Sequence, residues 1–167
     1  MKSEGVVLKN HFLLKTFPYD RFSIASGIIN SKNLGLELPK KVYLKWMGLR
    51  KGGRFCPETA DRIYINKISD KMCSTVVHET THKNHKIYNK GFWRFLVPEK
   101  SFDMTMFNQN KALIKDKIRP YAGKNHKELV ACIPQAFVKD GKTWSDFDPK
   151  IKELYEFYEG PKLNLVQ

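Results

Sequence analysis

Two histidines four residues apart, with a glutamate directly after the first, are the residues of this chain best suited to chemistry. Residues 78–82 read His-Glu-Thr-Thr-His. Positions four apart lie on one face of a helix, so His78 and His82 can both reach one tetrahedral Zn²⁺ ion. Glu79 then lies on the neighbouring side of the same turn, where it can take a proton from a metal-activated water instead of binding the metal. The pattern therefore indicates a zinc-dependent hydrolase.

A catalytic zinc site also needs a third protein ligand, because such sites usually combine three protein ligands with water. The candidates are His85, Tyr88, His126 and Glu128. His85 lies two helical turns beyond His78, roughly 10 Å along the axis, so we expect it to lie behind the ligands or at the surface. His126 and Glu128 belong to a separate predicted helix, which is geometrically suitable for completing the site.

The motif needs a helix to carry it, and the surrounding sequence predicts an α+β arrangement. Apolar stretches at residues 12–14 and 22–29 favour a first helix that ends near residues 30–31. Residues 42–46 and 62–66 read as strands, the second of them half-buried or at an edge, because they are β-branched, aromatic or alternating. Gly52 and Gly53 predict a turn or flexible loop.

Helices are expected to dominate the rest of the chain. Asp70 predicts the N-cap of a motif helix over residues 71–88, which Gly91 ends. Asn125 predicts the N-cap of the helix that carries Glu128, and Pro134 should kink that helix by removing a backbone hydrogen bond. The helix with Glu128 is expected over residues 126–139, and two further helices are expected over residues 108–117 and 149–158.

Residues 78–82 together with residues 121–131 (Tyr-Ala-Gly-Lys-Asn-His-Lys-Glu-Leu-Val-Ala) resemble the gluzincin class of metallopeptidases. The chain is most similar to the anthrax-lethal-factor-like group of toxin, phage and mobile-element proteins, over roughly residues 60–162. The resemblance implies a zincin-like metallopeptidase domain, with a small mixed sheet whose edge strand packs on the motif helix and a helical C-terminal part. It also implies Glu128 as the third Zn²⁺ ligand, Glu79 as general base and Tyr121 as hydrogen-bond donor to the oxyanion.

The chain departs from that family's pattern at three positions. Thr81 stands where the family often has glycine, and Cys132 stands where it often has glutamate. Pro134 within the ligand helix is also unexpected. Glu128 has a competing role, because Asn125-x-x-Glu128 fits a capping box, and a glutamate turned back to the Asn125 amide could not bind zinc. For Tyr121 the competing role is simple packing.

A second resemblance leads to a different substrate. His78, His82 and His85, followed by Gly-Phe-Trp-Arg-Phe-Leu at residues 91–96, are similar to WLM and SprT-type zincins. Those enzymes act on nucleic-acid-bound proteins, but their third histidine falls where this chain has Tyr88. A third reading is a non-catalytic, zinc-containing basic binding protein. A zinc deaminase is disfavoured, since the chain lacks H-x-E with P-C-x-x-C.

Composition bounds the remaining expectations. The 167 residues fit a single domain, residues 1–167, and the aromatic content is that of a folded protein. Three cysteines without a C-x-x-C pair favour free thiols over disulfides or a cysteine zinc cluster. Neither a membrane span nor a signal peptide is expected, which favours the cytoplasm, or the host cytoplasm if the chain is phage-encoded.

The expected partners follow from the motif and from the charge. We expect a protein or peptide substrate, which the strand at residues 62–66 could bind as an added strand, and a monomeric chain with no membrane contact. The net charge of +13 is spread along the sequence. It therefore favours a solvated basic surface, with at most weak contact to polyanions or nucleic acid.

Overall fold

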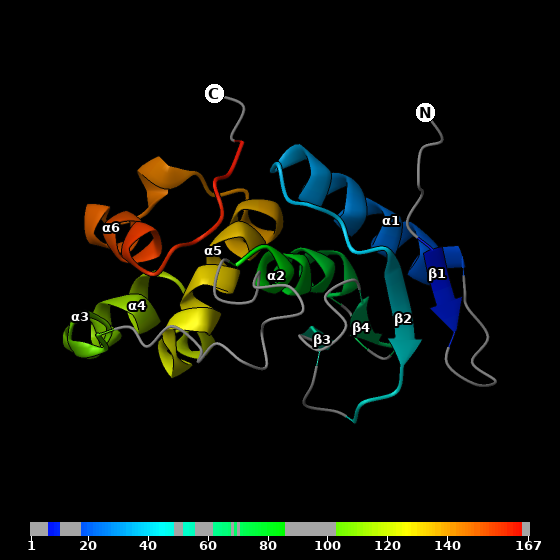
Figure 1. Cartoon of the computed structure of the whole chain (residues 1–167), viewed down its shortest axis with the longest axis horizontal. Coiled ribbons are helices and arrows are strands. Elements are labelled where there is room, and N and C mark those ends of the chain that lie inside the picture. Colours follow the sequence, from blue (N-terminus) through cyan, green and yellow to red (C-terminus); the bar gives the residue numbers. More distant parts are fainter. Residues whose placement is uncertain are drawn as a thin grey trace, which may run out of the picture.

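A small sheet followed by a helical region forms the described part of the chain, as the computed structural model shows (Figure 1). The structure describes residues 7–10, 18–48, 52–55, 62–67, 69, 71–85 and 103–164. The architecture is α+β with a mixed sheet, as predicted. None of the described helices is long and apolar enough to cross a membrane.

The sheet has four strands in the order β1-β2-β4-β3. Strands β1, β2 and β4 run parallel, and β3 pairs antiparallel with β4 at the end of the sheet. Side chains alternate across the sheet, so each strand directs every second residue to one face. The strand bounds are Val7–Asn10 for β1, Lys41–Lys45 for β2, Gly53–Phe55 for β3 and Arg62–Asn66 for β4.

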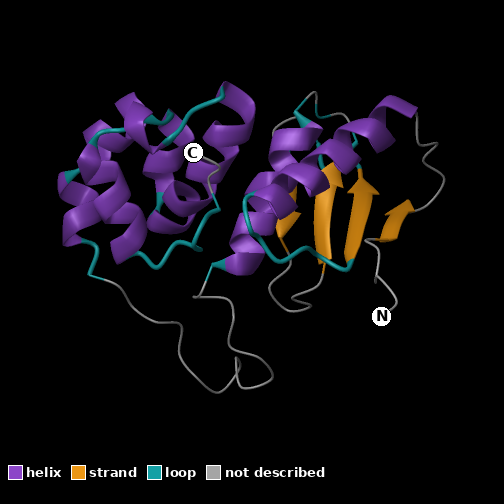
Figure 2. Ribbon diagram, turned by 90° about the horizontal axis from the view of Figure 1, so that it is seen from above, coloured by secondary structure: helices purple, strands orange, loops and turns teal. Residues whose placement is uncertain are grey.

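Two helices cover one face of this sheet, as Figure 2 shows. They are α1 (Pro18–Asn33) and α2 (Met72–Asn84). Apolar side chains of both helices pack on the inward residues of the strands and form the first hydrophobic cluster, composed of Ile24, Val42, Leu44, Phe55, Ile63, Ile65, Met72 and Val76. Burial of these apolar side chains supplies the main force that holds the sheet to the helices.

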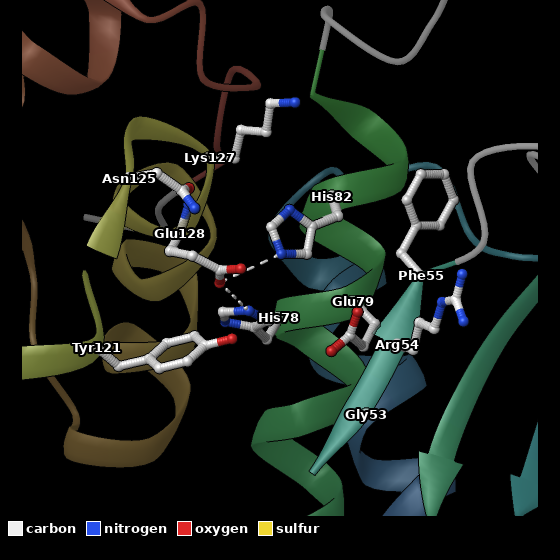
Figure 3. Close-up of a pocket in the computed structure, with 10 residues that line it drawn as sticks. All are labelled: Gly53, Arg54, Phe55, His78, Glu79, His82, Tyr121, Asn125, Lys127 and Glu128. Carbon is white, nitrogen blue, oxygen red and sulfur yellow. Dashed lines mark hydrogen bonds and ion pairs between the residues drawn. The ribbon is translucent and has the colours of Figure 1, made fainter. Parts of the chain in front are cut away.

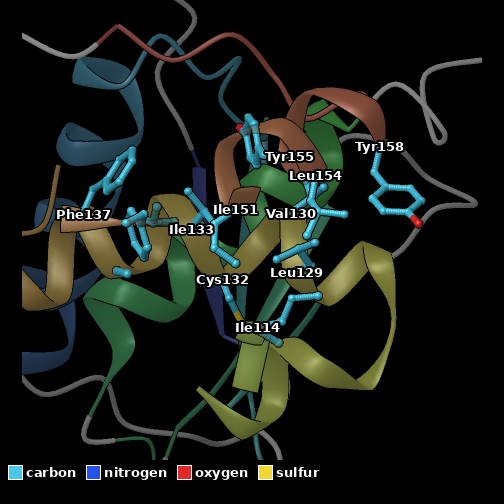
Figure 4. Close-up of a cluster of buried hydrophobic side chains, with 14 of the residues drawn as sticks. Ile114, Leu129, Val130, Cys132, Ile133, Phe137, Ile151, Leu154, Tyr155 and Tyr158 are labelled. Atoms are coloured by element: carbon cyan, nitrogen blue, oxygen red, sulfur yellow. The ribbon is translucent and has the colours of Figure 1, made fainter. Parts of the chain in front are cut away.

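The helical region after residue 103 packs around a second hydrophobic cluster (Figure 4). Its centre is α5 (His126–Asp140), which contributes the fully buried Leu129, Val130 and Ile133. The C-terminal helix α6 lies against it through Ile151 and Leu154. The remaining elements are α3 (Thr105–Gln109), α4 (Lys111–Lys117), the 3-10 helices η4 (Pro120–Lys124) and η5 (Trp144–Asp146), and α6 (Pro149–Phe157).

Helix α2 belongs to both halves of the fold. Val76 packs in the first cluster, and the next residue, Val77, packs in the second. Because α2 has neighbours on several sides, its polar residues from His78 to Lys83 are also buried. Buried polar groups are costly without partners, and charged partners reach α2 from outside it, with Glu128 beside His78 and His82.

Several sequence expectations about the strands require correction. Gly53 begins β3 and is not part of a turn or loop. The strand predicted at residues 62–66 is present as β4, but it pairs with β2 on one side and β3 on the other, so it is not an edge strand. A run of three residues with glycine has little intrinsic strand preference, which explains why β3 was missed.

Helix boundaries also differ from the prediction. Helix α2 ends at Asn84, four residues before the expected Tyr88, because His85 has an extended backbone. The single helix expected over residues 108–117 is two helices, α3 and α4, separated at Asn110, whose side chain donates to the Met106 carbonyl. Helix α5 continues through Pro134 to Asp140. The N-cap of α2 is Lys71, with no side-chain cap hydrogen bond, so the prediction of Asp70 as N-cap is wrong. Asp70 itself, the predicted stop Gly91 and residues 12–14 lie outside the described residues.

The crossing of α1 and α2 yields a stability prediction. A Cβ atom at Gly27 would lie 2.6 Å from the Cys73 carbonyl oxygen and 2.7 Å from Val76 Cβ. Gly27→Ala should therefore lower the free energy of unfolding by about 1–3 kcal/mol, although alanine in a helix normally gains about 1 kcal/mol over glycine. Urea denaturation followed by circular dichroism measures the change. Ile29→Ala, on the exposed side of α1, is the control and should stay within about 0.5 kcal/mol of the parent. A stabilised Gly27→Ala would contradict the close packing.

Candidate metal centre

Three side chains from two helices converge beside the sheet. His78 and His82 come from α2, and Glu128 comes from the first turn of α5 (Figure 3). Glu128 Oε2 lies 3.0 Å from His78 Nε2 and 3.5 Å from His82 Nε2. One nitrogen or oxygen atom from each residue lies within 4.8 Å of the others, so the group could hold a metal ion.

The spacing along α2 brings the two imidazoles together. Their ring centroids are 4.8 Å apart, with the planes nearly perpendicular. Both Nε2 atoms face the same carboxylate oxygen, as expected for residues one helical turn apart that serve one centre. The atoms offered are two imidazole nitrogens and one carboxylate oxygen, a set that zinc accepts in catalytic sites.

The start of α5 decides how Glu128 is used. Asn125 is the N-cap, as predicted, and its Oδ1 accepts a hydrogen bond from the Glu128 amide at 2.9 Å. The Glu128 carboxylate points to the imidazoles of His78 and His82. Of the two hydrogen bonds of a capping box, only the one from the Glu128 amide to the Asn125 side chain is therefore formed. The cap fixes the first turn of α5, and the side chain is left to face the histidines.

Electrostatics favour a charged Glu128 at this position. Burial by itself raises the pKa of the Glu128 carboxyl, but hydrogen bonds and charge from His82 and His78 outweigh it and hold the pKa well below its usual range. The carboxylate is thus anionic at neutral pH, in the form that binds cations. A negative oxygen beside two imidazole nitrogens is a suitable environment for a divalent cation.

Glu79 lies beside this group without belonging to it. Its side chain is buried and faces β3, where a Cβ atom on Gly53 would lie 2.9 Å from Glu79 Oε1. Burial raises the pKa of Glu79 to about 7, with a smaller rise from Glu128, against opposing effects of His82 and a hydrogen bond from the Phe55 backbone amide. A carboxyl group with this pKa can both accept and release a proton near neutral pH.

Tyr121 borders the same space from η4, directly before α5. Its side chain is 50% exposed, so it is not a core tyrosine, and its ring centroid lies 6.0 Å from that of His78. Figure 3 shows its hydroxyl directed toward the space between α5 and α2. Burial of the hydroxyl side and the nearby Glu128 and Glu79 carboxylates raise its pKa, which keeps the phenol protonated as a donor.

These residues line a cleft of about 310 Å³ between β3 on one side and α5 on the other. The backbone of β3 forms part of its wall. The Gly52 carbonyl accepts a hydrogen bond from the Asn66 amide at 2.7 Å. Hydrogen-bonded pairs recur at every second residue of an antiparallel ladder, so the backbone N–H and C=O of Arg54 also point toward β4. The backbone groups of Gly53 and Phe55 then point away from β4, which agrees with the Phe55 amide donating to Glu79. The lining residues are Gly53, Arg54, Phe55, His78, Glu79, His82, Tyr121, Asn125, Lys127 and Glu128.

The other two histidines considered as ligands are placed elsewhere. His85 is fully buried, and its Nε2 donates to the Tyr158 carbonyl at 2.6 Å, which excludes the surface, one of its two expected positions. Burial lowers the pKa of His85 to about 4, which keeps the ring neutral. His126 packs on the Tyr158 ring at 5.1 Å between centroids. Both link the end of α2 and the start of α5 to the C-terminal region. Tyr88 lies outside the described residues.

Sequence reasoning missed the contribution of β3 to the site. Gly53 permits the strand to approach Glu79, and the Phe55 amide contacts the Glu79 carboxylate. The Gly-Gly pair was the available signal, because glycine in a strand often marks close approach of another chain segment. Among the described cysteines, Cys73 and Cys132 are free thiols, as predicted, and burial raises the pKa of Cys132 to about 12.

Comparison with known protein families, with curated proteins and with solved structures finds no match to this chain. Any assignment of function therefore depends on the site itself.

The geometry predicts which substitutions abolish metal binding. The purified chain should bind about one divalent ion, measured by inductively coupled plasma mass spectrometry after dialysis against zinc. His82→Ala and Glu128→Ala should each reduce this to near zero, because each removes one of three ligand atoms that face one another. His126→Gln is the control, since His126 is outside the group. Full metal content in both variants, with unchanged circular dichroism spectra, would contradict the ligand set.

Proposed function

We propose that the chain is a zinc-dependent peptidase with a zincin-like fold of the gluzincin type. The observation that carries this proposal is the convergence of His78, His82 and Glu128, with Glu79 next to the group in the wall of an open cleft. These three residues would hold the ion, and three protein ligands are the number typical of catalytic rather than structural zinc sites. The adjacent carboxylate and phenol supply a base and a hydrogen-bond donor.

Each residue then has a defined role in peptide hydrolysis. When bound, Zn²⁺ supplies Lewis acidity at the scissile carbonyl and lowers the pKa of water toward neutrality. Glu79 accepts the proton from the attacking water and returns it to the leaving amine. Tyr121 donates a hydrogen bond to the oxyanion of the tetrahedral intermediate. The Phe55 amide and the close approach of Gly53 hold the Glu79 carboxylate in place.

The substrate would lie along β3 rather than β4. Strand β4 is paired on both sides and has no free edge for another strand. Strand β3 ends the sheet among the described strands, and the outward backbone groups of Gly53 and the outward carbonyl of Phe55 border the cleft, while the Phe55 amide donates to Glu79. An extended peptide can pair with such an edge through main-chain hydrogen bonds, which makes the binding tolerant of sequence. In this proposal the scissile bond lies between β3 and the three ligands.

The role of Glu79 is tested by removing its charge and keeping its shape. Glu79→Gln should keep zinc at the parental level and lower kcat for a fluorogenic peptide library by at least about 10³-fold, since the amide cannot accept the proton. Zinc content and turnover are measured on the same preparation. A variant that retains zinc and cleaves at the parental rate would eliminate Glu79 as the base. Parental protein that binds zinc but cleaves no peptide would favour a non-catalytic zinc protein.

The role of Tyr121 is tested by removing only its hydroxyl. Tyr121→Phe should lower kcat by about 10²-fold, with little change in KM, because the donor acts on charge that develops in the transition state. Zinc stoichiometry should not change, since Tyr121 is outside the ligand group. Tyr155→Phe serves as the control, because that hydroxyl donates to the Pro161 carbonyl in the C-terminal region. An equal loss in both variants would point to destabilisation, and an unaffected kcat in Tyr121→Phe would eliminate the role.

A further inference from the structure

The face of the sheet turned away from α1 and α2 has a distinct composition. Strands β2, β3 and β4 alternate, so the residues between the buried apolar positions project to this second face. Gly53 and Phe55 face α2 and the first hydrophobic cluster, which directs the Arg54 side chain to the opposite side. We call this surface the basic sheet face; its residues are Lys41, Tyr43, Lys45, Arg54, Arg62 and Tyr64.

Strand register brings these six side chains together. Tyr43 pairs with Tyr64, and Tyr64 pairs with Arg54, so one row crosses three strands. The two tyrosine rings stack with centroids 5.2 Å apart and planes 24° apart. Lys41 pairs with Arg62 beside this row, and the Arg62 guanidinium carbon lies 6.0 Å from the Tyr43 ring centroid. Two stacked aromatic rings therefore lie among four cations.

Among the described side chains of these strands, the charge on this face is of one sign. Strands β2, β3 and β4 contain no acidic residue, so none of their side chains neutralises the four cations. Lys45 and Arg54 are exposed, while Lys41, Arg62 and the two tyrosines are half-buried. Four cations within one small patch, in a chain of net charge +13, create a local positive potential that attracts polyanions.

We propose that the basic sheet face binds single-stranded nucleic acid. Cations alone would suit any polyanion, whereas aromatic side chains among cations suit a chain that alternates phosphates with flat bases. Phosphates would contact the lysines and arginines, and bases would stack on the tyrosine pair. The binding is sequence-tolerant, because every base has an aromatic face. The proposal does not rest on the proposed peptidase, since the candidate metal centre lies on the helix-covered side of the sheet, although β3 borders both surfaces.

Fluorescence anisotropy with a labelled oligo(dT) of about 20 nucleotides tests the proposal on the full chain. The logarithm of the association constant should fall with the logarithm of salt concentration with a slope of about −3, as four phosphate contacts require. Lys45→Glu/Arg54→Glu should weaken binding at least about tenfold and flatten this slope. Lys152→Glu/Lys162→Glu, the matched control, makes the same charge change in the C-terminal region and should weaken binding less than about threefold.

Stacking is tested separately from charge. Tyr43→Leu keeps the apolar bulk of the strand and should weaken oligo(dT) binding by at least about fivefold, because stacking on one ring is lost. Thermal unfolding checks that each variant is folded, and the exposed Lys45 and Arg54 provide the test if the tyrosine variant is not. Polyglutamate should compete poorly at equal charge. The proposal is overturned if polyglutamate competes as well as unlabelled oligo(dT), if the control weakens binding equally, or if folded Tyr43→Leu binds normally.

Discussion

The contact between Glu128 and the two imidazoles is the interaction on which the arrangement of this molecule depends. Helix α2 is buried on several sides, so the polar groups of its motif residues are removed from water, which costs free energy unless they have partners. Glu128 supplies that partner from a helix about 50 residues away in sequence. It can do so because Asn125 caps α5 and fixes the direction of its first turn. The second hydrophobic cluster then holds α5 against α2.

A second constraint is the close approach of β3 to α2. Without a side chain at position 53, the strand lies close enough for the Phe55 amide to reach the Glu79 carboxylate. A larger residue would separate the strand from the helix and open the wall of the cleft. The three residues of β3 contribute to both faces of the sheet, because Arg54 projects away from α2 while Gly53 and Phe55 face α2. The cleft and the basic sheet face therefore share one strand.

Local patterns in the sequence predicted the elements that carry the site. The i,i+4 histidines imply a helix, and Asn125 followed by an apolar run implies a capped one, so α2 and α5 were both expected. Spacing could not decide whether Glu128 faces the histidines or its own cap, because both need the same residue types. Tertiary contacts decide that, as they decide the early end of α2 at His85, whose ring bonds to Tyr158. Strand β3 was missed because glycine there serves packing, which propensity does not report.

The net charge indicates a binding surface only when the fold shows which charged residues lie together. Thirty basic residues spread along the sequence predict little more than a solvated surface. Strand alternation changes this, since it sorts four cations and two tyrosines onto one face of the sheet. Helices α2 and α5 place the carboxylates Glu79 and Glu128 in the cleft on the other side. A polyanion on the basic sheet face would leave the cleft open to a peptide. For the proposed peptidase, proteins bound to the same nucleic acid would then be held at high local concentration near the candidate metal centre, which would favour their cleavage over that of free proteins.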